Sequence, residues 1–557
     1  MDIISEIINS FYSFTENLFN INIKSLENLD TSLNINYSKQ NFGDISSNIA
    51  LLLAKVLQKN PKNIAQDIVN DFKNPHIESI KIEGPGFINI FLKLDTIKEL
   101  AFNIFTQDQN YFIGINKSHK NYSVEFVSAN PTGPLHIGHG RGGIIGDVLS
   151  NILKFLSNTV TKEFYINDAG TQIQKLGISL KTRILQELGE DIELEEDSYH
   201  GKYLIDLAQK CIKQYSLKTK EDINNAQADD SNFFGDYAKN YLLNNIKKIL
   251  EKYGIEYDVW FSETKLHKND SIDKAIKYLE SKNYIYKKDD ALWFTSRQFA
   301  DDKDRVIQKS TGQYTYVAAD IAYLQDKIGR GADKIIMVLG QDHHSYVTRL
   351  KGLMSALGYN PDDLTVILYQ LVTVKENDQV LRLSKRAGKI ITLEDVINLV
   401  GSDVARFFYL NKKADAHLDF DLGLALTQTD ENPVYYVQYA YVRTLSILNK
   451  AKFQSGIEYT IEQQDHKFIG ESERLLIKKI ASLKNLLSSI SKNYQVHLLA
   501  YYVLELAQLF HSYYGSNKVI DNNNIELSRG RLFTIKLLNR TFYTCFKILG
   551  ISAPEHM

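Results

Sequence analysis

The sequence is poor in cysteine and contains no long apolar run. Cys211 and Cys545 lie far apart and allow at most one disulfide, and no CxxC pair or Cys/His cluster offers a metal site. No apolar run approaches the roughly 20 residues that span a bilayer. The first residues also lack the basic region and the small-residue cleavage site of a secretory signal. We therefore expect a cytoplasmic protein that does not enter a membrane.

The charge balance also lacks a dominant sign, since the formal net charge is -2 at pH 7. This balance neither favours nor excludes a nucleic-acid partner, because a basic stripe can lie on one face of a nearly neutral protein. With 557 residues, 44% of them hydrophobic and 24% charged, the chain is long enough for about two to four globular domains. It contains no fixed-period repeat and no low-complexity tract.

Sequence patterns divide the chain into three parts. These are residues 1–115, 116–392 and 393–557. The first part combines amphipathic helical patterns, among them 44–60, with two short strands around the Gly-Pro-Gly turn of "KIEGPGFINIFL", which indicates a small α+β domain. The last part is mostly helical, and its apolar stripes predict a helical bundle. Those stripes cover residues 471–490, 497–515 and 531–550.

The middle part has the pattern of a doubly wound α/β sheet. Near-continuous apolar strands alternate with amphipathic helices, which is typical of a parallel sheet covered by helices on both faces. The predicted strands are 122–129, 159–168, 333–340 and 364–372, and the predicted helices include 142–156 and 346–358. Residues from about 190 to 310 are irregular and charged. We expect a helix-containing insertion there that lies outside the main sheet.

A glycine-rich stretch, "SANPTGPLHIGHGRGG" at 128–143, follows the first strand of the middle part. Ligands of a doubly wound sheet bind at the carboxyl ends of its strands, where a helix N-terminus offers N–H groups and partial positive charge to a phosphate. His136 and His139 can donate hydrogen bonds to phosphate oxygens. The glycines that would let the backbone approach a ligand are Gly138, Gly140, Gly142 and Gly143. A helix-capping loop with an incidental histidine pair is the alternative.

A basic stretch, "VLRLSKRAGKIITLEDVI", follows the last predicted strand of the middle part. Its cations are Arg382, Lys385, Arg386 and Lys389. Cations on a loop suit a polyphosphate leaving group, which carries several negative charges. A solvated basic loop is the alternative interpretation.

Together, "HIGH" at 136–139 and "RLSKR" at 382–386 resemble the paired signatures of class I aminoacyl-tRNA synthetases. The second motif departs from the family's Lys-Met-Ser-Lys-Ser, because Arg382, Leu383 and Arg386 replace three residues while Ser384 and Lys385 remain. Longer segments are similar to bacterial arginyl-tRNA synthetases. They include "VEFVSANPTGPLHIGHGRG", "YINDAGTQI", "TYVAADIAY", "GQDHHSY", "NPVYYVQYAYVR" and "NFGDISSNIALLLAK". The resemblance implies a Rossmann-like catalytic domain, an N-terminal domain that contacts the tRNA body and a C-terminal anticodon-binding bundle.

The resemblance further implies an arginine pocket. A guanidinium is planar and permanently charged, and a carboxylate that accepts two hydrogen bonds holds it best. Tyr316 and Asp320 are four residues apart, hence on one face if "YTYVAAD" is helical, and the resemblance makes Asp320 the residue that grips the guanidinium. The other implied pocket residues are the carboxylates Glu263 and Glu125, and Asn130 and Gln341 for the amino and carboxylate end. Taken singly, each acid is more simply a surface ion pair or a core-edge residue.

Nucleotide and tRNA contacts follow from the same resemblance. The implied ATP-binding residues are His136, Gly138, His139, Gly140, His344, Ser384 and Lys385, of which His136, His139 and Lys385 are catalytic. Mg²⁺ accompanies ATP and is held mainly by its phosphates, so no protein metal cage is expected. The resemblance also implies that Asn167, Asp168, Gly170 and Gln172 support the active site, with a simple Asn-Asp turn as the alternative. Tyr435, Tyr439 and Arg443 are expected to contact tRNA by stacking and charge, although a tyrosine-rich helix also suits a core.

The predicted function is that of an arginyl-tRNA synthetase. ATP and L-arginine give arginyl adenylate and pyrophosphate, and the 3′ end of tRNA-Arg then takes the arginyl group. The resemblance also implies a monomer that needs bound tRNA for the first step. The alternatives are a class I synthetase of another specificity, a small-metabolite nucleotidyltransferase with an HxGH loop, and a non-catalytic tRNA-binding paralogue. The nucleotidyltransferase needs no helical tail, and the paralogue would be expected to lose His136, His139 or Lys385, which are present.

Overall fold

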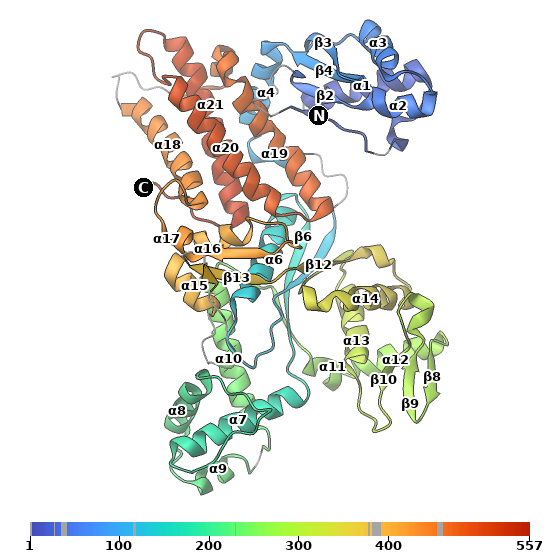
Figure 1. The fold of residues 1–557 in the computed structure, drawn as a ribbon, viewed down its shortest axis with the longest axis vertical. Coiled ribbons are helices and arrows are strands. Elements are labelled where there is room, and N and C mark those ends of the chain that lie inside the picture. Colours follow the sequence, from blue (N-terminus) through green and yellow to red (C-terminus); the bar gives the residue numbers. More distant parts are fainter. Residues whose placement is uncertain are drawn as a thin grey trace. The chain divides into compact units, whose positions relative to one another are not determined.

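The computed structural model describes residues 3–26, 28–34, 42–114, 119–228, 230–376, 379–380, 392–453 and 460–557. The chain forms two compact units (Figure 1). Unit 1 consists of residues 1–117, 428–493 and 498–557, and unit 2 of residues 118–427 and 494–497. The N-terminal and C-terminal segments therefore share one unit, whereas the sequence-based division into three domains stays a prediction.

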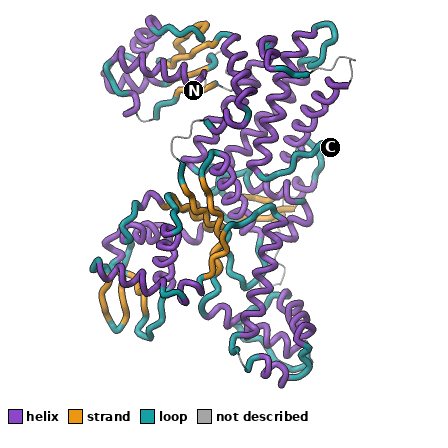
Figure 2. Tube along the Cα trace, turned by 180° about the vertical axis from the view of Figure 1, so that it is seen from behind, coloured by secondary structure: helices purple, strands orange, loops and turns teal. Residues whose placement is uncertain are grey.

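Unit 2 is built on a five-stranded parallel sheet among the described residues, with the strand order β12-β11-β5-β6-β7 (Figure 2). The strands are β5 (Asn121–Phe126), β6 (Thr159–Ile166), β7 (Val259–Ser262), β11 (Lys334–Gly340) and β12 (Leu364–Tyr369). The chain runs outward from β5 through β6 to β7, then returns to β11 on the other side of β5. The predicted doubly wound topology is confirmed, and its switch point lies between β5 and β11.

Strand β7 corrects the prediction for residues 190–310. Val259–Ser262 forms the edge strand of the main sheet and pairs in parallel with β6, so the expectation that the whole segment lies outside this sheet is wrong. The strand has only four residues, and three of them are partly exposed. A short edge strand lacks the continuous apolar run by which a central parallel strand is recognised.

The helices of unit 2 include those that flank its main sheet and those of two lobes. Helices beside the sheet and in its connections are α6 (Ile137–Phe155), α11 (Thr264–Lys268), α12 (Ser271–Ser281), α13 (Tyr316–Gly329) and α14 (His344–Ala356). One lobe consists of α7 (Thr171–Glu187), α8 (Tyr203–Tyr215), α9 (Lys220–Ala226) and α10 (Phe233–Lys252), packed around an apolar core of its own. The other contains the antiparallel sheet of β8 (Ile285–Lys288), β9 (Ala291–Phe294) and β10 (Arg305–Gln308).

Unit 2 continues beyond the main sheet to Thr427. Its further elements are β13 (Val372–Glu376), β14 (Gln379–Val380), α15 (Leu393–Val400), α16 (Ser402–Tyr409), β15 (Leu418–Asp421) and α17 (Leu422–Leu426). Arg406 on α16 is fully buried and pairs with the buried Asp147 of α6. Because an uncompensated buried charge is costly, this ion pair fixes α16 against the helix that follows the first motif.

The N-terminal part of unit 1 is a small α+β fold, as predicted. Its antiparallel sheet has the order β1-β2-β4-β3. The elements are α1 (Ile3–Phe19), β1 (Thr31–Leu33), β2 (Ile45–Ser47), α2 (Ile49–Leu57), α3 (Pro61–Asp71), β3 (Ile77–Glu83), β4 (Phe87–Leu92), α4 (Leu94–Gln107) and α5 (Gln109–Ile113). The helix predicted from residue 44 begins only at Ile49, because the preceding residues pair with β4.

The C-terminal part of unit 1 is the predicted helical bundle (Figure 1). It contains α18 (Pro433–Phe453), α19 (Arg474–Asn493), α20 (His497–Ser516) and α21 (Ile525–Leu549). The apolar stripe of α19 is buried at Leu476, Ile480, Leu483, Leu487 and Ile490, so helical periodicity located this core correctly. Within the described ranges, no helix is both long and apolar enough to span a bilayer.

Candidate active site

The carboxyl edge of the parallel sheet carries most of the predicted site residues. Glu125 lies near the end of β5, Glu263 directly follows β7 and Gln341 directly follows β11. Tyr316 and Asp320 lie in the first turns of α13, which is helical as expected and leads back to the start of β11. A helix that precedes a parallel strand begins near the carboxyl edge of the sheet. The topology therefore brings these residues to one edge.

The two histidines of the first motif lie stacked at the start of α6. Their ring centroids are 3.6 Å apart at an interplanar angle of 27°. Nδ1 of His136 accepts a hydrogen bond from the Gly138 N–H at 3.2 Å, and Nδ1 of His139 accepts one from the His136 N–H at 3.2 Å. Each neutral ring therefore carries its proton on Nε2. Burial and the neighbouring His136 lower the pKa of His139 to about 3, so its ring is neutral near pH 7.

The glycines of this motif have a packing reason that the sequence did not reveal. A Cβ on Gly140 would lie 2.6 Å from Leu393, and one on Gly142 would lie 2.6 Å from Tyr369. A Cβ on Gly143 would lie 2.9 Å from Ile255. These glycines let α6 approach side chains of its own unit, and the ATP contact of Gly140 stays a prediction. At Gly138 a Cβ would meet only the His136 ring, at 3.0 Å.

Asp320 on α13 is half-buried, and one of its two carboxylate oxygens is itself buried without a donor. Its Oδ1 accepts a hydrogen bond from the Tyr346 hydroxyl, while no described residue donates to its buried Oδ2. Burial raises the pKa of Asp320 to about 7; Tyr346 and Arg349 oppose the increase, and Glu263 and Glu125 add to it. A buried carboxylate oxygen without a donor is unusual. It is suited to a ligand that brings a cation and donors of its own.

Glu125, in contrast, already has partners. Its Oε2 lies 3.1 Å from Lys327 Nζ and accepts the Tyr323 hydroxyl at 3.0 Å, and its Oε1 accepts the Ser128 hydroxyl at 3.1 Å. Lys327 is fully buried and also lies 3.4 Å from Glu163. The charge of Glu125 is therefore balanced within unit 2. Of the three predicted pocket carboxylates, Glu125 is the one whose two oxygens both have close partners in the absence of a substrate.

Glu263 follows the edge strand and is held by its neighbours. Tyr165 at the end of β6 donates a hydrogen bond to its carboxylate, and burial together with nearby Asp168 raises the pKa of Glu263. Asp168 accepts the Ser262 hydroxyl at 2.6 Å, and the Thr264 N–H and hydroxyl at 3.0 Å each. Asp168 thus ties the residues on both sides of Glu263 to the end of β6, which gives it a positioning role.

A strained turn joins β5 to the first motif. Val127 has φ +67°, and the Ser128 N–H donates to the Phe126 carbonyl at 3.0 Å, which closes a γ-turn at Val127. Positive φ is strongly disfavoured for a β-branched residue. The turn places the Ser128 hydroxyl between two strands, where it donates to Glu125 and accepts the Tyr165 N–H at 3.0 Å. Strain of this kind is typical of functional sites.

The remaining predicted contacts differ in their exposure, and two of them lie outside the described residues. Asn130 and His344 are exposed, and Gln341 is half-buried. Ser384 and Lys385 lie outside the described residues, so their roles stay predictions. Thr392, the first described residue after them, forms an antiparallel bridge with His136, and the Leu393 N–H donates to the Leu135 carbonyl at 2.8 Å. The chain that follows the second motif is therefore attached directly to the first.

Two of the predicted tRNA contacts in unit 1, Tyr439 and Arg443, form part of an aromatic cluster. Arg443 donates to the Tyr439 hydroxyl at 2.8 Å, and its guanidinium carbon lies 5.5 Å from the Tyr439 ring centre and 5.3 Å from that of Tyr514. His511 stacks on Tyr439 at 5.7 Å between centroids. Tyr439 is 44% exposed and Tyr514 37%. Tyr435 is half-buried on the same helix.

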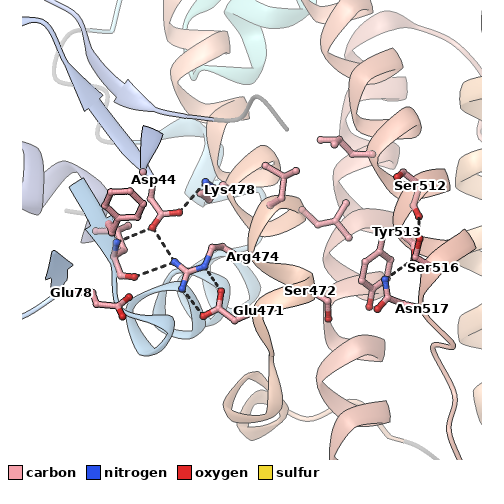
Figure 3. Close-up of a pocket in the computed structure, with 16 residues that line it drawn as sticks. Asp44, Glu78, Glu471, Ser472, Arg474, Lys478, Ser512, Tyr513, Ser516 and Asn517 are labelled. Atoms are coloured by element: carbon pink, nitrogen blue, oxygen red, sulfur yellow. Dashed lines mark hydrogen bonds and ion pairs between the residues drawn. The ribbon is translucent and has the colours of Figure 1, made fainter. Parts of the chain in front are cut away.

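A cavity of about 540 Å³ in unit 1 lies between the N-terminal sheet and the bundle (Figure 3). Asp44 lies 3.0 Å from Arg474 and 2.9 Å from Lys478, and Arg474 also pairs with Glu471 at 2.6 Å. These four charged groups pair with one another, so the cavity marks a junction of two parts of unit 1. It contains none of the predicted active-site residues.

No group of three or more His, Cys, Asp or Glu residues within the described ranges is placed to hold a metal ion.

Comparison with known families gives three matches. The catalytic domain of tRNA synthetases class I (R) matches residues 101–414, the arginyl tRNA synthetase N-terminal domain matches residues 3–92, and the DALR anticodon binding domain matches residues 437–557. The parallel sheet with the HIGH motif at its carboxyl edge is thus the catalytic fold of a class I aminoacyl-tRNA synthetase.

Similar proteins specify the family. The arginine–tRNA ligase of Bacillus subtilis is 40% identical over 517 residues, which are 92% of this chain and 92% of that protein, and the one from Anoxybacillus flavithermus is 41% identical over the same shares. The structure of Thermus thermophilus arginyl-tRNA synthetase has a TM-score of 0.75 at 20% identity, covering 99% of this chain and 100% of that one, which shows a common fold. This chain belongs to the arginyl-tRNA synthetase family. The predicted fold class and enzyme function are thereby confirmed.

The structure adds residues that sequence reasoning missed. Tyr346 and Arg349 on α14 reach the Asp320 region, and Tyr165 holds Glu263. Their spacing offers a weak signal, because Tyr346 and Arg349 are three apart on one helix. Nothing local links them to Asp320, which lies on another helix. Tyr514 and His511 likewise join Tyr439 only through the packing of α20 beside α18.

Proposed function

We propose that this chain joins L-arginine to tRNA-Arg in two steps at the carboxyl edge of the unit 2 sheet. In the first step the arginine carboxylate attacks the α-phosphorus of ATP, forming a carboxylate–phosphorus bond while the bond to pyrophosphate breaks. In the second step the 3′ end of the tRNA takes the arginyl group and AMP leaves. Both steps depend on positioning and on neutralising phosphate charge.

The nucleotide end of the site is proposed to be the start of α6. The arrangement of His136 and His139 supports this, because each neutral ring offers an Nε2–H to a phosphate oxygen. The helix N-terminus adds partial positive charge. Gly138, Gly140 and His344 are proposed to border the nucleotide, with Ser384 and Lys385 contacting the departing pyrophosphate. Mg²⁺ would be held mainly by the phosphates.

The arginine end is proposed to be the region of Asp320 and Glu263. The observation that carries this proposal is the buried Oδ2 of Asp320, for which no described residue supplies a donor. A guanidinium supplies paired N–H donors and a permanent positive charge, which favour the ionised carboxylate. Tyr316, 67% exposed on the same helix, offers its ring as a stacking surface. Asn130, Gln341 and Glu125 are proposed to surround the rest of the amino acid.

The aromatic cluster of unit 1 is the proposed contact for unpaired tRNA bases. Two half-exposed tyrosine rings and the guanidinium of Arg443 provide stacking surfaces and one charge for phosphate. Tyr435, Tyr439 and Arg443 are the residues proposed from the sequence, and we add Tyr514 because its ring lies beside the Arg443 guanidinium. We also propose, on the family resemblance alone, that the enzyme acts as a monomer in the cytoplasm.

The experiment that tests the arginine site is steady-state aminoacylation by Asp320→Asn with tRNA-Arg and ATP at saturation. We expect KM for arginine to rise by about a hundredfold or more, since a guanidinium–carboxylate pair is lost from a buried site. Asp290→Asn, an exposed turn residue of unit 2, is the matched control and should keep the wild-type KM. An Asp320→Asn enzyme with a wild-type KM would refute the assignment of the pocket.

A further inference from the structure

Arg349 lies beside the arginine pocket and is absent from the site predicted from the sequence. Its guanidinium carbon is 4.6 Å from the ring centre of Tyr346 and 5.4 Å from that of Tyr316. The hydroxyl of the same Tyr346 donates to Asp320 Oδ1. One tyrosine therefore holds the pocket carboxylate with its edge and the Arg349 guanidinium against its face.

Arg349 and Asp320 both have buried hydrogen-bonding atoms without a partner among the described residues. Nε and Nη1 of Arg349 are buried and donate to no described residue, and Asp320 Oδ2 accepts from none. The two charges thus lie close enough to interact electrostatically without a hydrogen bond between these atoms. This differs from the other buried pairs of unit 2, such as Arg406 and Asp147, which are in direct contact. The free oxygen of Asp320 remains open to a ligand.

The positive charge of Arg349 affects the ionisation of Asp320, because other carboxylates lie nearby. Glu125 on β5 and Glu263 after β7 both disfavour a second negative charge at Asp320, while Tyr346 and Arg349 on α14 favour it. Tyr165 on β6 lies near the same acids, and its pKa is raised first by burial and then by the charges of Glu263 and Asp320. Glu125 is paired with Lys327, whereas Glu263 accepts a hydrogen bond from the Tyr165 hydroxyl and lies 4.0 Å from His267 Nε2. Among the described residues, the cation that stabilises the ionised form of Asp320 is Arg349.

We propose that Arg349 is a positioning residue of the arginine pocket: its guanidinium, held on Tyr346, is the resident countercharge that keeps Asp320 ionised and its Oδ2 open for the substrate guanidinium. This proposal rests on the proposed arginine site. A guanidinium suits the role because it stays charged when buried and stacks on an aromatic face. A residue that bonded directly to Oδ2 would compete with the substrate.

The test is the pH dependence of KM for arginine in aminoacylation, from pH 6 to 9, with tRNA and ATP at saturation. In the wild type, KM should rise as the pH falls through the midpoint at which Asp320 takes up a proton. Arg349→Met should move that midpoint to higher pH by about 1 unit, the low end of the shift that a nearby opposite charge produces. The difference in KM between the two enzymes should shrink as the pH rises.

Two further variants separate charge from packing. Arg349→Lys keeps a cation and should bring the midpoint back toward the wild-type value. Tyr346→Phe keeps the ring but removes the hydrogen bond to Asp320, so it should raise the midpoint as Arg349→Met does. Arg297→Met, an exposed arginine of unit 2, is the matched control for loss of one positive charge. It should leave the midpoint unchanged.

An unchanged midpoint in Arg349→Met, with KM raised equally at every pH, would overturn the proposal in favour of a purely structural role. A larger loss of affinity for arginine than for argininamide, which lacks the carboxylate, would overturn it in favour of direct contact with the substrate carboxylate. Failure of the arginine site itself is recognised separately, because Asp320→Asn would then show the wild-type KM and the wild-type pH dependence.

Discussion

At the residue scale, the two histidines of the first motif are fixed by backbone hydrogen bonds before any ligand arrives. Both Nδ1 atoms accept from N–H groups of the motif itself, which leaves Nε2–H as the donor on each ring. A neutral imidazole that donates to a phosphate oxygen pays a smaller desolvation cost than a charged imidazolium would. We infer that the pair acts through hydrogen bonds from neutral rings.

This arrangement predicts the protonation of His139. Since burial and His136 lower its pKa to about 3, we expect no titration of His139 between pH 5 and 8 and a proton on Nε2 throughout. Nitrogen-15 NMR of histidine-labelled enzyme reports both properties, and His139→Gln identifies the resonance. A His139 resonance that titrates within this range, or carries its proton on Nδ1, would contradict the geometry.

Sequence reasoning predicted which side chains belong to the site better than it predicted which neighbours they contact. The family resemblance implies that Asp320 binds a guanidinium, and its Oδ2 is buried without a donor from the described residues. Its contact with Tyr346 depends on how two helices pack, which no local pattern encodes. The neutrality of His139 likewise depends on burial, which a motif does not reveal.

At the scale of elements, the site depends on how the edge strand β7 is attached. Asp168 accepts hydrogen bonds from Ser262 and Thr264, the two neighbours of Glu263. The Glu263 N–H also donates to the Ile166 carbonyl at 3.1 Å, at the end of β6. The position of the Glu263 carboxylate is therefore set by the end of the neighbouring strand.

We expect Asp168→Ala to raise KM for arginine by about tenfold, equivalent to 1.4 kcal/mol, because Glu263 loses the contacts that orient it. The free energy of unfolding should fall by about 1–3 kcal/mol, since three donors lose their acceptor. Kinetics at saturating tRNA and urea unfolding measure the two effects. Glu190→Ala, an exposed carboxylate of unit 2, is the control. Loss of stability without a change in KM would argue against the positioning role.

Elements with a strong period were predicted well, and short edge elements were not. The helix that contains Ile144, Val148 and Leu149 has the predicted apolar face, and strand β11 is a nearly continuous apolar run. Strand β7 has four residues and half-exposed side chains, so only its pairing with β6 reveals it. Strand β2 was read as the start of a helix because its pairing with β4 is likewise non-local.

At the scale of the whole molecule, the two ends of the chain share unit 1. Asp44, from the N-terminal part, is nearly buried and pairs with Arg474 and Lys478 of α19, while also accepting the Leu92 N–H at 2.8 Å (Figure 3). Lys478 is 5% exposed at its side chain. Removing Asp44 would leave a buried cation without its partner, which is more costly than losing a surface pair.

We therefore expect Asp44→Ala to lower the free energy of unfolding by about 3–5 kcal/mol. Glu471→Gln, which removes an exposed partner of Arg474, should change it by no more than about 1 kcal/mol. Chemical unfolding of the full chain measures both. Equal effects of the two substitutions would show that burial at this junction does not control its stability. No local pattern could predict this junction, because Asp44 and Arg474 lie hundreds of positions apart in the chain.

The central claim is that unit 2 activates arginine for transfer to tRNA, and the most direct measurement is aminoacylation of tRNA-Arg with each of the proteinogenic amino acids in turn. We expect ATP-dependent charging with L-arginine, strongly preferred over lysine, because the carboxylates of the pocket are matched to a planar guanidinium. Charging with another amino acid at comparable efficiency, or no charging with arginine, would contradict it.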